Sequence, residues 1–282
     1  MTPENFPMTD PTARRGRSRL RLIAAGAIAL VPLLPVIVGL LLSSGSGGSG
    51  AAAATTTAPA TVAGHFDPVT PAPKAAPQNL LLPAGTGALV AALQHPTGLR
   101  SAPGGRVFTR LATRTEFGSP EVLLVAKLSG RWLGVVTPQS GNGHLGWIPA
   151  SDASLSRVDW QIKVSLSHHQ LRVLRNGRTV RRFTVAVGMP SAPTPTGRFA
   201  VTDRLNTGDP SGPYGCCIVA LSAKAPHAIQ DWPGGNRIAI HSTPETWTIG
   251  ENASHGCLRL TLAEGRWLLD NIPLGTPAFI ST

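Results

Sequence analysis

A cysteine, a histidine and a glycine near the end of the chain have the residue types and spacing of a thiol-based acyl-transfer site. Cys257 lies in the segment Ser254-His255-Gly256-Cys257-Leu258-Arg259, and His241 precedes this cysteine by 16 residues. A free thiol has a pKa of about 8.5, so only a few per cent of it is thiolate at neutral pH. A histidine within hydrogen-bond reach can take the thiol proton and later return it to a leaving amine. Gly256 leaves the sulfur uncrowded, and backbone N–H groups beside it could stabilise a developing oxyanion.

These residues have two other possible interpretations. An isolated cysteine is usually a small buried apolar side chain. An unpaired thiol outside the membrane is a liability, however, and the three cysteines of the chain leave at least one unpaired. A zinc site built from His241, His255 and Cys257 would lack the ligand spacing of known zinc sites. Spacing alone therefore leaves both a catalytic Cys257 and a buried structural thiol open, and we expect no metal and no cofactor.

The segments around these residues predict short strands that bring them together. An apolar strand over 238–240 ends at His241, and a second strand covers 257–260. The stretch between them contains proline, glycine and asparagine, which favour a loop. A strand, a returning loop and a second strand would place the imidazole beside the thiol. Thr261 and Glu264 have the spacing of a capping box, which predicts a helix from there to about residue 272.

The rest of region 157–282 predicts a mainly β domain. Ile162, Val164 and Leu166 alternate with polar residues, as in a half-buried strand. Asn176-Gly177 lies between two apolar runs and is a strong hairpin signal. A last strand is expected over 278–280.

The start of the chain predicts a membrane anchor. Residues 22–42 are uncharged and mostly apolar, and a helix of 21 residues is about 30 Å long, enough to cross a hydrocarbon core. The basic segment 1–21 before it should stay cytoplasmic, which puts the rest of the chain outside. A cleaved signal peptide is the alternative, although its apolar stretch would be shorter. Residues 43–79 consist mostly of Ser, Gly, Ala, Thr and Pro and predict a disordered linker.

Region 80–156 has short apolar runs separated by turn residues, which favours a small β-barrel. The order of Leu99-Arg100-Ser101-Ala102-Pro103, Trp132-Leu133 and Gly146-Trp147-Ile148 resembles bacterial SH3-like domains. That resemblance implies either binding of cell-wall peptides or a packing role beside a catalytic domain.

Charge and composition limit the partners of the chain. The formal net charge is +11, and five arginines fall within the first 21 residues. Such a surplus suits nucleic acid, an anionic membrane or an anionic cell envelope. No nucleic-acid-binding motif accompanies it, so we expect no nucleic-acid partner.

Several motifs of the last region together resemble the L,D-transpeptidase catalytic domain, which cross-links peptidoglycan. The resemblance covers about 158–282 and rests on motifs in matching order and spacing: Val187-Gly188, Pro193-Thr194-Pro195-Thr196-Gly197-Arg198-Phe199, Gly235-Asn236-Arg237-Ile238-Ala239-Ile240, His241-Ser242-Thr243-Pro244, Ile249-Gly250 and Ser254-His255-Gly256-Cys257-Leu258-Arg259. It implies a β-sandwich fold for this region, which the expected SH3-like domain precedes. It also implies carbapenem β-lactams as covalent inhibitors, and the membrane anchor expected at 22–42 would place this domain on the cell-wall side of the membrane.

The resemblance further implies a role for each matching residue. Cys257 attacks a donor stem peptide and forms a thioester with release of D-Ala, and an acceptor amine completes a 3→3 cross-link. His241 moves the protons and is oriented by the backbone carbonyl of Ser242, where many relatives have glycine. His255 and Gly256 line the oxyanion hole together with the cysteine.

Other residues near the site have less specific expectations. Arg259 contacts either a substrate carboxylate or a structural partner, and Ser254 and Tyr214 are expected to contact substrate. Cys216-Cys217 are expected to be buried thiols, because a bond between neighbouring cysteines is strained. Glu245 and Glu251 are expected to be solvated loop charges.

The sequence leaves three alternative functions open. They are another cysteine acyltransferase of the cell wall, an L,D-carboxypeptidase on the same scaffold, and a catalytically silent wall-binding protein. The intact pair His241 and Cys257 argues against the silent protein.

Overall fold

A computed structural model describes residues 82–226 and 236–282 of the chain. The predicted cytoplasmic segment 1–21, membrane anchor 22–42 and linker 43–79 lie outside the described residues. Within the described ranges, no helix combines the length and the apolar character needed to cross a membrane.

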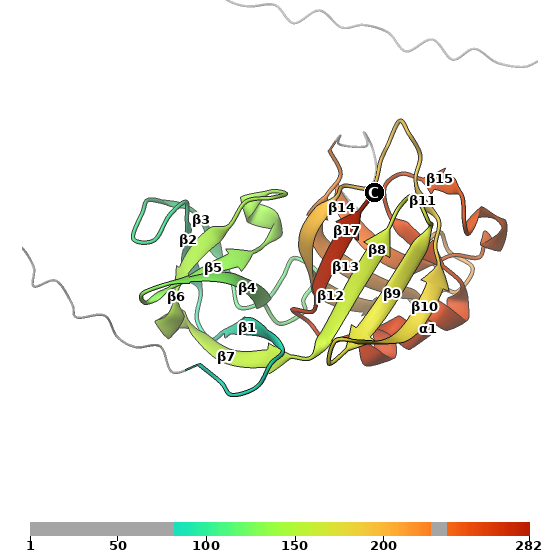
Figure 1. The fold of residues 1–282 in the computed structure, drawn as a ribbon. Helices are drawn as coiled ribbons and strands as arrows, with labels where there is room; N and C mark the ends of the chain where they lie inside the picture. The colour runs from blue at the N-terminus through green and yellow to red at the C-terminus, as the bar shows by residue number, and fades with distance from the viewer. Residues whose placement is uncertain (1–81, 227–235) are drawn as a thin grey trace, which may run out of the picture. The chain divides into compact units, whose positions relative to one another are not determined.

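The first part of the described chain is a seven-stranded antiparallel sheet in the order β3-β2-β6-β5-β4-β1-β7 (Figure 1). Its elements are β1 Ala88–Leu93, β2 Thr97–Arg100, β3 Val107–Leu111, β4 Val122–Ser129, β5 Trp132–Val136, η1 Pro138–Ser140, β6 Gly146–Pro149, η2 Ala150–Asp152 and β7 Ala153–Val158. Leu99, Leu123, Leu133 and Ile148 are fully buried and form its core. The likeness of this sheet to SH3 domains stays a prediction.

The second part is an eight-stranded sheet in the order β10-β9-β8-β17-β12-β13-β14-β16, with a two-stranded pair, β11 and β15, beside it. Its elements are β8 Trp160–Ser165, β9 Gln170–Arg175, β10 Arg178–Thr184, β11 Val187–Gly188, β12 Gly197–Asn206, β13 Cys217–Lys224, β14 Arg237–Ser242, η3 Thr246–Thr248, β15 Asn252–Ser254, β16 Leu258–Leu260, α1 Leu262–Asn271 and β17 Pro277–Ser281. The described chain is therefore mainly β, as predicted.

The eight-stranded sheet bends at its long strand β12, whose register shifts between Val201 and Asp203. The strands on the two sides of β12 enclose one apolar core, to which β8 contributes Ile162 and β14 contributes Ile240 (Figure 1). Helix α1 packs against β13 and β14 and contributes Leu268 to the same core. This packing supports β14, the strand that carries His241.

Two local predictions are confirmed. Thr261 caps α1, its side chain accepts from the Glu264 backbone N–H, and the Glu264 carboxylate accepts from the Thr261 N–H. Asn176 and Gly177 join β9 to β10 with φ angles of 49° and 75°, the left-handed backbone that an Asn-Gly hairpin requires. Both features are local in sequence, which is why the sequence alone predicts them.

The two sheets contact each other through polar side chains. The Asn142 amide donates to the Lys224 carbonyl oxygen at 2.7 Å and accepts from the Lys224 N–H at 2.9 Å. The Thr115 hydroxyl donates to the carboxylate of Asp203, which is completely buried. These contacts tie the first sheet to β12 and β13 of the second.

Candidate active site

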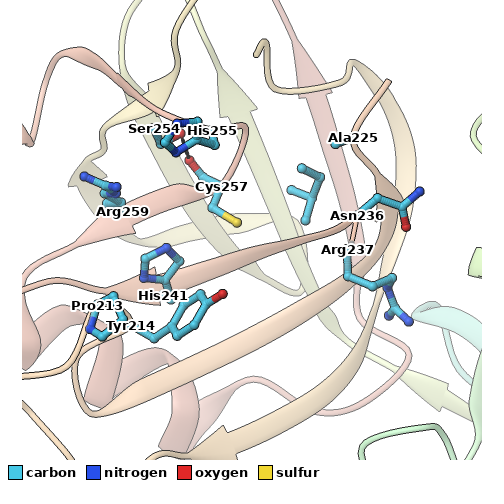
Figure 2. A pocket seen from close by; sticks show the side chains of 11 residues that line it. Pro213, Tyr214, Ala225, Asn236, Arg237, His241, Ser254, His255, Cys257 and Arg259 are labelled. Atoms are coloured by element: carbon cyan, nitrogen blue, oxygen red, sulfur yellow. Dashed lines mark hydrogen bonds between the residues drawn. The ribbon is translucent and has the colours of Figure 1, made fainter. Parts of the chain in front are cut away.

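Three segments form one pocket. β14 carries His241, the turn between β15 and β16 carries Cys257, and the loop before β13 carries Tyr214 (Figure 2). β14 and β16 are adjacent parallel strands, with His241 opposite Arg259. Two parallel strands joined by a returning loop therefore bring the predicted histidine and cysteine into the same pocket, as expected.

The thiol of Cys257 is free and half-buried. Burial raises the pKa of Cys257, while the Ala239 N–H, which lies 3.4 Å from the sulfur, and the positive charge of Arg259 act in the opposite direction. The thiol is therefore protonated at neutral pH. A nucleophile at this position needs a base at the moment of attack.

His241 lines the same pocket as the thiol. Its side chain is 4% exposed, and its Nδ1 lies 2.7 Å from the Ser242 carbonyl oxygen. Burial lowers the pKa of His241 to about 4, the charge of Arg259 adds to this effect, and the Ser242 carbonyl opposes it. The ring is thus neutral at pH 7. Because a carbonyl oxygen can only accept, the proton sits on Nδ1 and the Nε2 lone pair is left to take a proton.

The turn before Cys257 is fixed by hydrogen bonds. The Ser254 hydroxyl donates to the Cys257 carbonyl oxygen at 2.5 Å and accepts from the Gly256 N–H at 3.1 Å. Gly256 has a φ of 110°, and a Cβ there would lie 2.9 Å from the Ile238 side chain. A side chain at position 256 would therefore be strained both by the backbone and by its neighbour.

Thr194 also holds this turn, and sequence reasoning missed its role. Its buried hydroxyl donates to the Gly256 carbonyl oxygen at 2.9 Å and accepts from the Gly188 N–H at 2.9 Å. The only signal in the sequence was its place within a motif that resembles the family. A bond between residues 62 positions apart becomes visible only in the folded chain.

Residues 159–280 match a family model described as YkuD, L,D-transpeptidase catalytic domain. They are an L,D-transpeptidase catalytic domain. A putative L,D-transpeptidase YkuD from Bacillus licheniformis is 29% identical over 124 residues, which cover 44% of this chain and 67% of that protein. L,D-transpeptidase 1 from Mycobacterium tuberculosis is 30% identical over 126 residues, which cover 40% of this chain and 47% of that protein. The aligned part of the chain thus spans between about half and two thirds of these relatives.

Among solved structures, the LD transpeptidase LdtMt1 in complex with imipenem aligns with a TM-score of 0.36 and 20% identity. The alignment covers 53% of this chain and 90% of that one.

Within this L,D-transpeptidase domain, the residues predicted for the site lie around the same pocket. Tyr214, Ser254, His255, Cys257 and Arg259 line it, and the Tyr214 ring meets the His241 ring edge-on, with their centroids 5.0 Å apart. Ser242 lies behind the histidine, where its carbonyl accepts the Nδ1 proton. Gly256 is buried in the turn beside Cys257.

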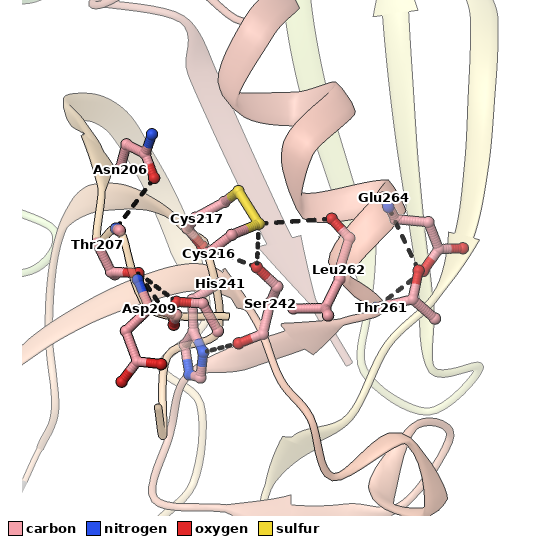
Figure 3. The surroundings of a disulfide bond; sticks show 12 residues. Asn206, Thr207, Asp209, Cys216, Cys217, His241, Ser242, Thr261, Leu262 and Glu264 are labelled. Carbon is pink, nitrogen blue, oxygen red and sulfur yellow. Dashed lines mark hydrogen bonds between the residues drawn. A yellow bond between two sulfur atoms is a disulfide. The ribbon is translucent and has the colours of Figure 1, made fainter. Parts of the chain in front are cut away.

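One expectation about neighbouring residues was wrong, and another was confirmed only in part. Glu245 and Glu251 are exposed loop residues, as expected, but the Glu245 carboxylate also pairs with Arg259 at 2.9 Å, so this arginine has a structural partner. Cys216 and Cys217 are not thiols but form a disulfide (Figure 3). Cys216 lies in the turn before β13, so the alternation that sends neighbouring strand side chains to opposite faces does not separate the two sulfurs.

Proposed function

We propose that this chain is a peptidoglycan L,D-transpeptidase that forms 3→3 cross-links through a thioester on Cys257. One observation carries the proposal. In a matched L,D-transpeptidase domain, the free thiol shares a pocket with the neutral imidazole of His241, whose Nδ1 is bonded to the Ser242 carbonyl. That arrangement leaves Nε2 as the base for a protonated thiol.

The acylation half-reaction starts with transfer of the Cys257 proton to Nε2 of His241. The sulfur attacks the carbonyl carbon of the third residue of a donor stem peptide, and a tetrahedral oxyanion forms. Backbone N–H groups of the rigid turn at His255, Gly256 and Cys257 stabilise that oxyanion; losing one such donor typically costs about 2.7–4 kcal/mol. Nε2 then returns the proton to the amine of D-Ala, which leaves, and a thioester remains.

The second half-reaction transfers the acyl group to an amine of an acceptor stem. His241 takes the proton of the attacking amine, the tetrahedral intermediate collapses, and the Cys257 sulfur leaves and is reprotonated. Arg259 and Tyr214 line the pocket and contact the stem peptides. Ser254, which is 1% exposed and uses its hydroxyl within the turn, acts on substrate only by holding that turn in place. The Glu245 pair holds Arg259 in place, so this arginine acts on substrate from a fixed position.

The expected location and inhibitors follow from the same proposal. Residues 22–42 anchor the chain in the cytoplasmic membrane, with the catalytic domain on the cell-wall side, where its substrate lies. Carbapenems acylate Cys257, because their strained lactam carbonyl presents the thiol with an acyl group. Protease added to intact spheroplasts of the producing cell would test the location, because it should degrade only a domain on the outer side of the membrane.

The test of function is incubation of the full-length chain with disaccharide-tetrapeptides, followed by mass analysis of the products. Wild type should release D-Ala and form dimers, and Cys257→Ala and His241→Ala should do neither. His95→Ala, which changes an exposed histidine in a turn of the first sheet, is the matched control and should keep full activity. Tripeptide without dimer would identify an L,D-carboxypeptidase, and activity in Cys257→Ala would refute the nucleophile.

A further inference from the structure

A buried disulfide lies directly behind the histidine. Cys216 and Cys217 are 8% and 1% exposed, and they end the loop that enters β13. The Cys216 sulfur lies 3.4 Å from the hydroxyl oxygen of Ser242 and 3.6 Å from the Leu262 carbonyl oxygen (Figure 3). The residue that orients His241 through its carbonyl thus touches the disulfide through its side chain.

Ser242 has no free space in which to move. It is completely buried, and its hydroxyl also lies 3.4 Å from the Cys217 carbonyl oxygen. A Cβ on Gly215 would lie 2.9 Å from Ser242, and a Cβ on Gly265 would lie 2.7 Å from its hydroxyl oxygen. The serine side chain is therefore enclosed by the cysteine loop on one side and by α1 on the other.

Two short routes lead from the disulfide to the imidazole. The first passes from Cys216 to the Ser242 side chain and then through the Ser242 carbonyl to Nδ1 of His241. The second passes along the backbone from Cys216 through Gly215 to Tyr214, whose ring packs edge-on against the histidine ring. A displacement of the two sulfurs would therefore move His241 both through Ser242 and through Tyr214.

We propose that the Cys216–Cys217 disulfide positions His241, so that the transpeptidase works at full rate only while this pair is oxidised. The proposal rests on the proposed function. Two bonded sulfurs are about 2.05 Å apart, whereas two non-bonded atoms need roughly 3.5–4 Å. In a close-packed site this separation has to be taken up by Ser242 or by the loop that carries Tyr214, and an error of about 1 Å in a catalytic group can cost about a hundredfold in rate.

The test reduces the full-length protein in mild detergent with a water-soluble phosphine, which is removed before the assay. Phosphorus attacks one sulfur and the S–S bond breaks. Water supplies the oxygen of the phosphine oxide, and two protons convert Cys216 and Cys217 to thiols. Mass analysis after alkylation under denaturing conditions should count one thiol before reduction and three after it. Cys257 stays a thiol throughout, so its own state is unchanged.

Reduction should lower kcat for cross-linking by at least about tenfold with little change in KM, and reoxidation should restore it. The pH profile of carbapenem acylation should shift as well, because reduction disturbs the hydrogen bond between Nδ1 of His241 and the Ser242 carbonyl oxygen. Cys216→Ser/Cys217→Ser should resemble the reduced enzyme and should not respond to phosphine.

Ser242→Gly is the matched variant that separates positioning from general stability. It keeps the carbonyl but removes the side chain enclosed between Gly215 and Gly265, so that only the route through Tyr214 remains. Reduction should therefore lower its rate clearly less than the tenfold expected of wild type. A reduced wild type with unchanged kcat and pH profile would overturn the proposal. So would an equal loss in Ser242→Gly, or a reduced wild type that melts below the assay temperature. An oxidised wild type that makes no cross-links would refute the proposed function instead.

Discussion

Glu121 is a buried carboxyl where the two sheets meet, and Glu121→Gln isolates the free energy of its ionisation. Glu121 is only 5% exposed. Burial raises the pKa of Glu121 to about 7, the nearby Asp203 and Glu116 carboxylates add to the rise, and the Arg237 guanidinium opposes it. Arg237 is itself paired with Glu116 and lies in β14, the strand of His241.

The sign of the effect follows from comparing the folded and unfolded states. The unfolded carboxyl keeps its usual pKa of 4.5, so folding favours the protonated acid. The stability due to this group is fully present below pH 4.5 and is lost as the pH rises through 7. At about 1.4 kcal/mol per pKa unit, the loss approaches ~3 kcal/mol above pH 8. Glutamine has the shape of the protonated acid and does not ionise.

Glu121→Gln should therefore raise the free energy of unfolding by about 1–3 kcal/mol at pH 8.5 and change it little at pH 4.5. Urea unfolding of both proteins, followed by tryptophan fluorescence at several pH values, measures this difference. Other titrating groups cancel in the comparison of variant with wild type. Glu251→Gln, which changes an exposed loop carboxylate, is the control and should stay within about 0.5 kcal/mol. An equal effect of Glu121→Gln at both pH values would refute the reasoning.

Three further predictions follow from the site and its supports. Because the pKa of His241 is lowered to about 4, its contribution to stability is present above pH 6.5 and is lost as the pH falls towards 4. In His241→Gln, the free energy of unfolding measured in urea should therefore fall by ~3 kcal/mol less than that of wild type between pH 6.5 and pH 4. Gly265→Ala places a Cβ 2.7 Å from the Ser242 hydroxyl oxygen, so it should cost about 1–3 kcal/mol and lower kcat, whereas unchanged kinetics would contradict the tight packing. Thr261→Ala removes the cap of α1 and should cost about 1 kcal/mol in thermal unfolding, with acylation of Cys257 retained.

The sequence predicted those parts of the site that depend on local spacing. The cap at Thr261 and the Asn176-Gly177 hairpin are each set by a few neighbouring residues, and both are present. The meeting of His241 and Cys257 could be predicted because one loop joins two strands, and parallel pairing of β14 with β16 puts their side chains into one pocket. Segments 1–79 remain predictions from composition and apolar length.

The parts that could not be predicted depend on residues far apart in the sequence. Thr194 forms a hydrogen bond to the Gly256 carbonyl, and Glu245 forms an ion pair with Arg259. Both contacts form only when the strands and loops that carry these residues are already in place. The Cys216–Cys217 disulfide could not be predicted from two adjacent cysteines alone, because it depends on the turn that precedes β13 and on the packing of Ser242 around it.

Burial shifts the pKa values of Cys257 and His241 in opposite directions, and these shifts determine the protonation state of both groups before substrate binds. It raises the pKa of the Cys257 thiol and lowers that of the His241 imidazole, so proton transfer between them is unfavourable before a substrate arrives. A protonated thiol is slow to oxidise and slow to attack a disulfide, so the protonated state keeps the free Cys257 thiol chemically stable in the absence of substrate. The same burial makes His241 a weak base. In the proposed mechanism, the rate then depends on the rigid turn at Gly256 stabilising the oxyanion as the proton moves, and on the fixed orientation of the imidazole. Under that mechanism the residues that hold His241 in place affect the rate even though they do not touch the substrate.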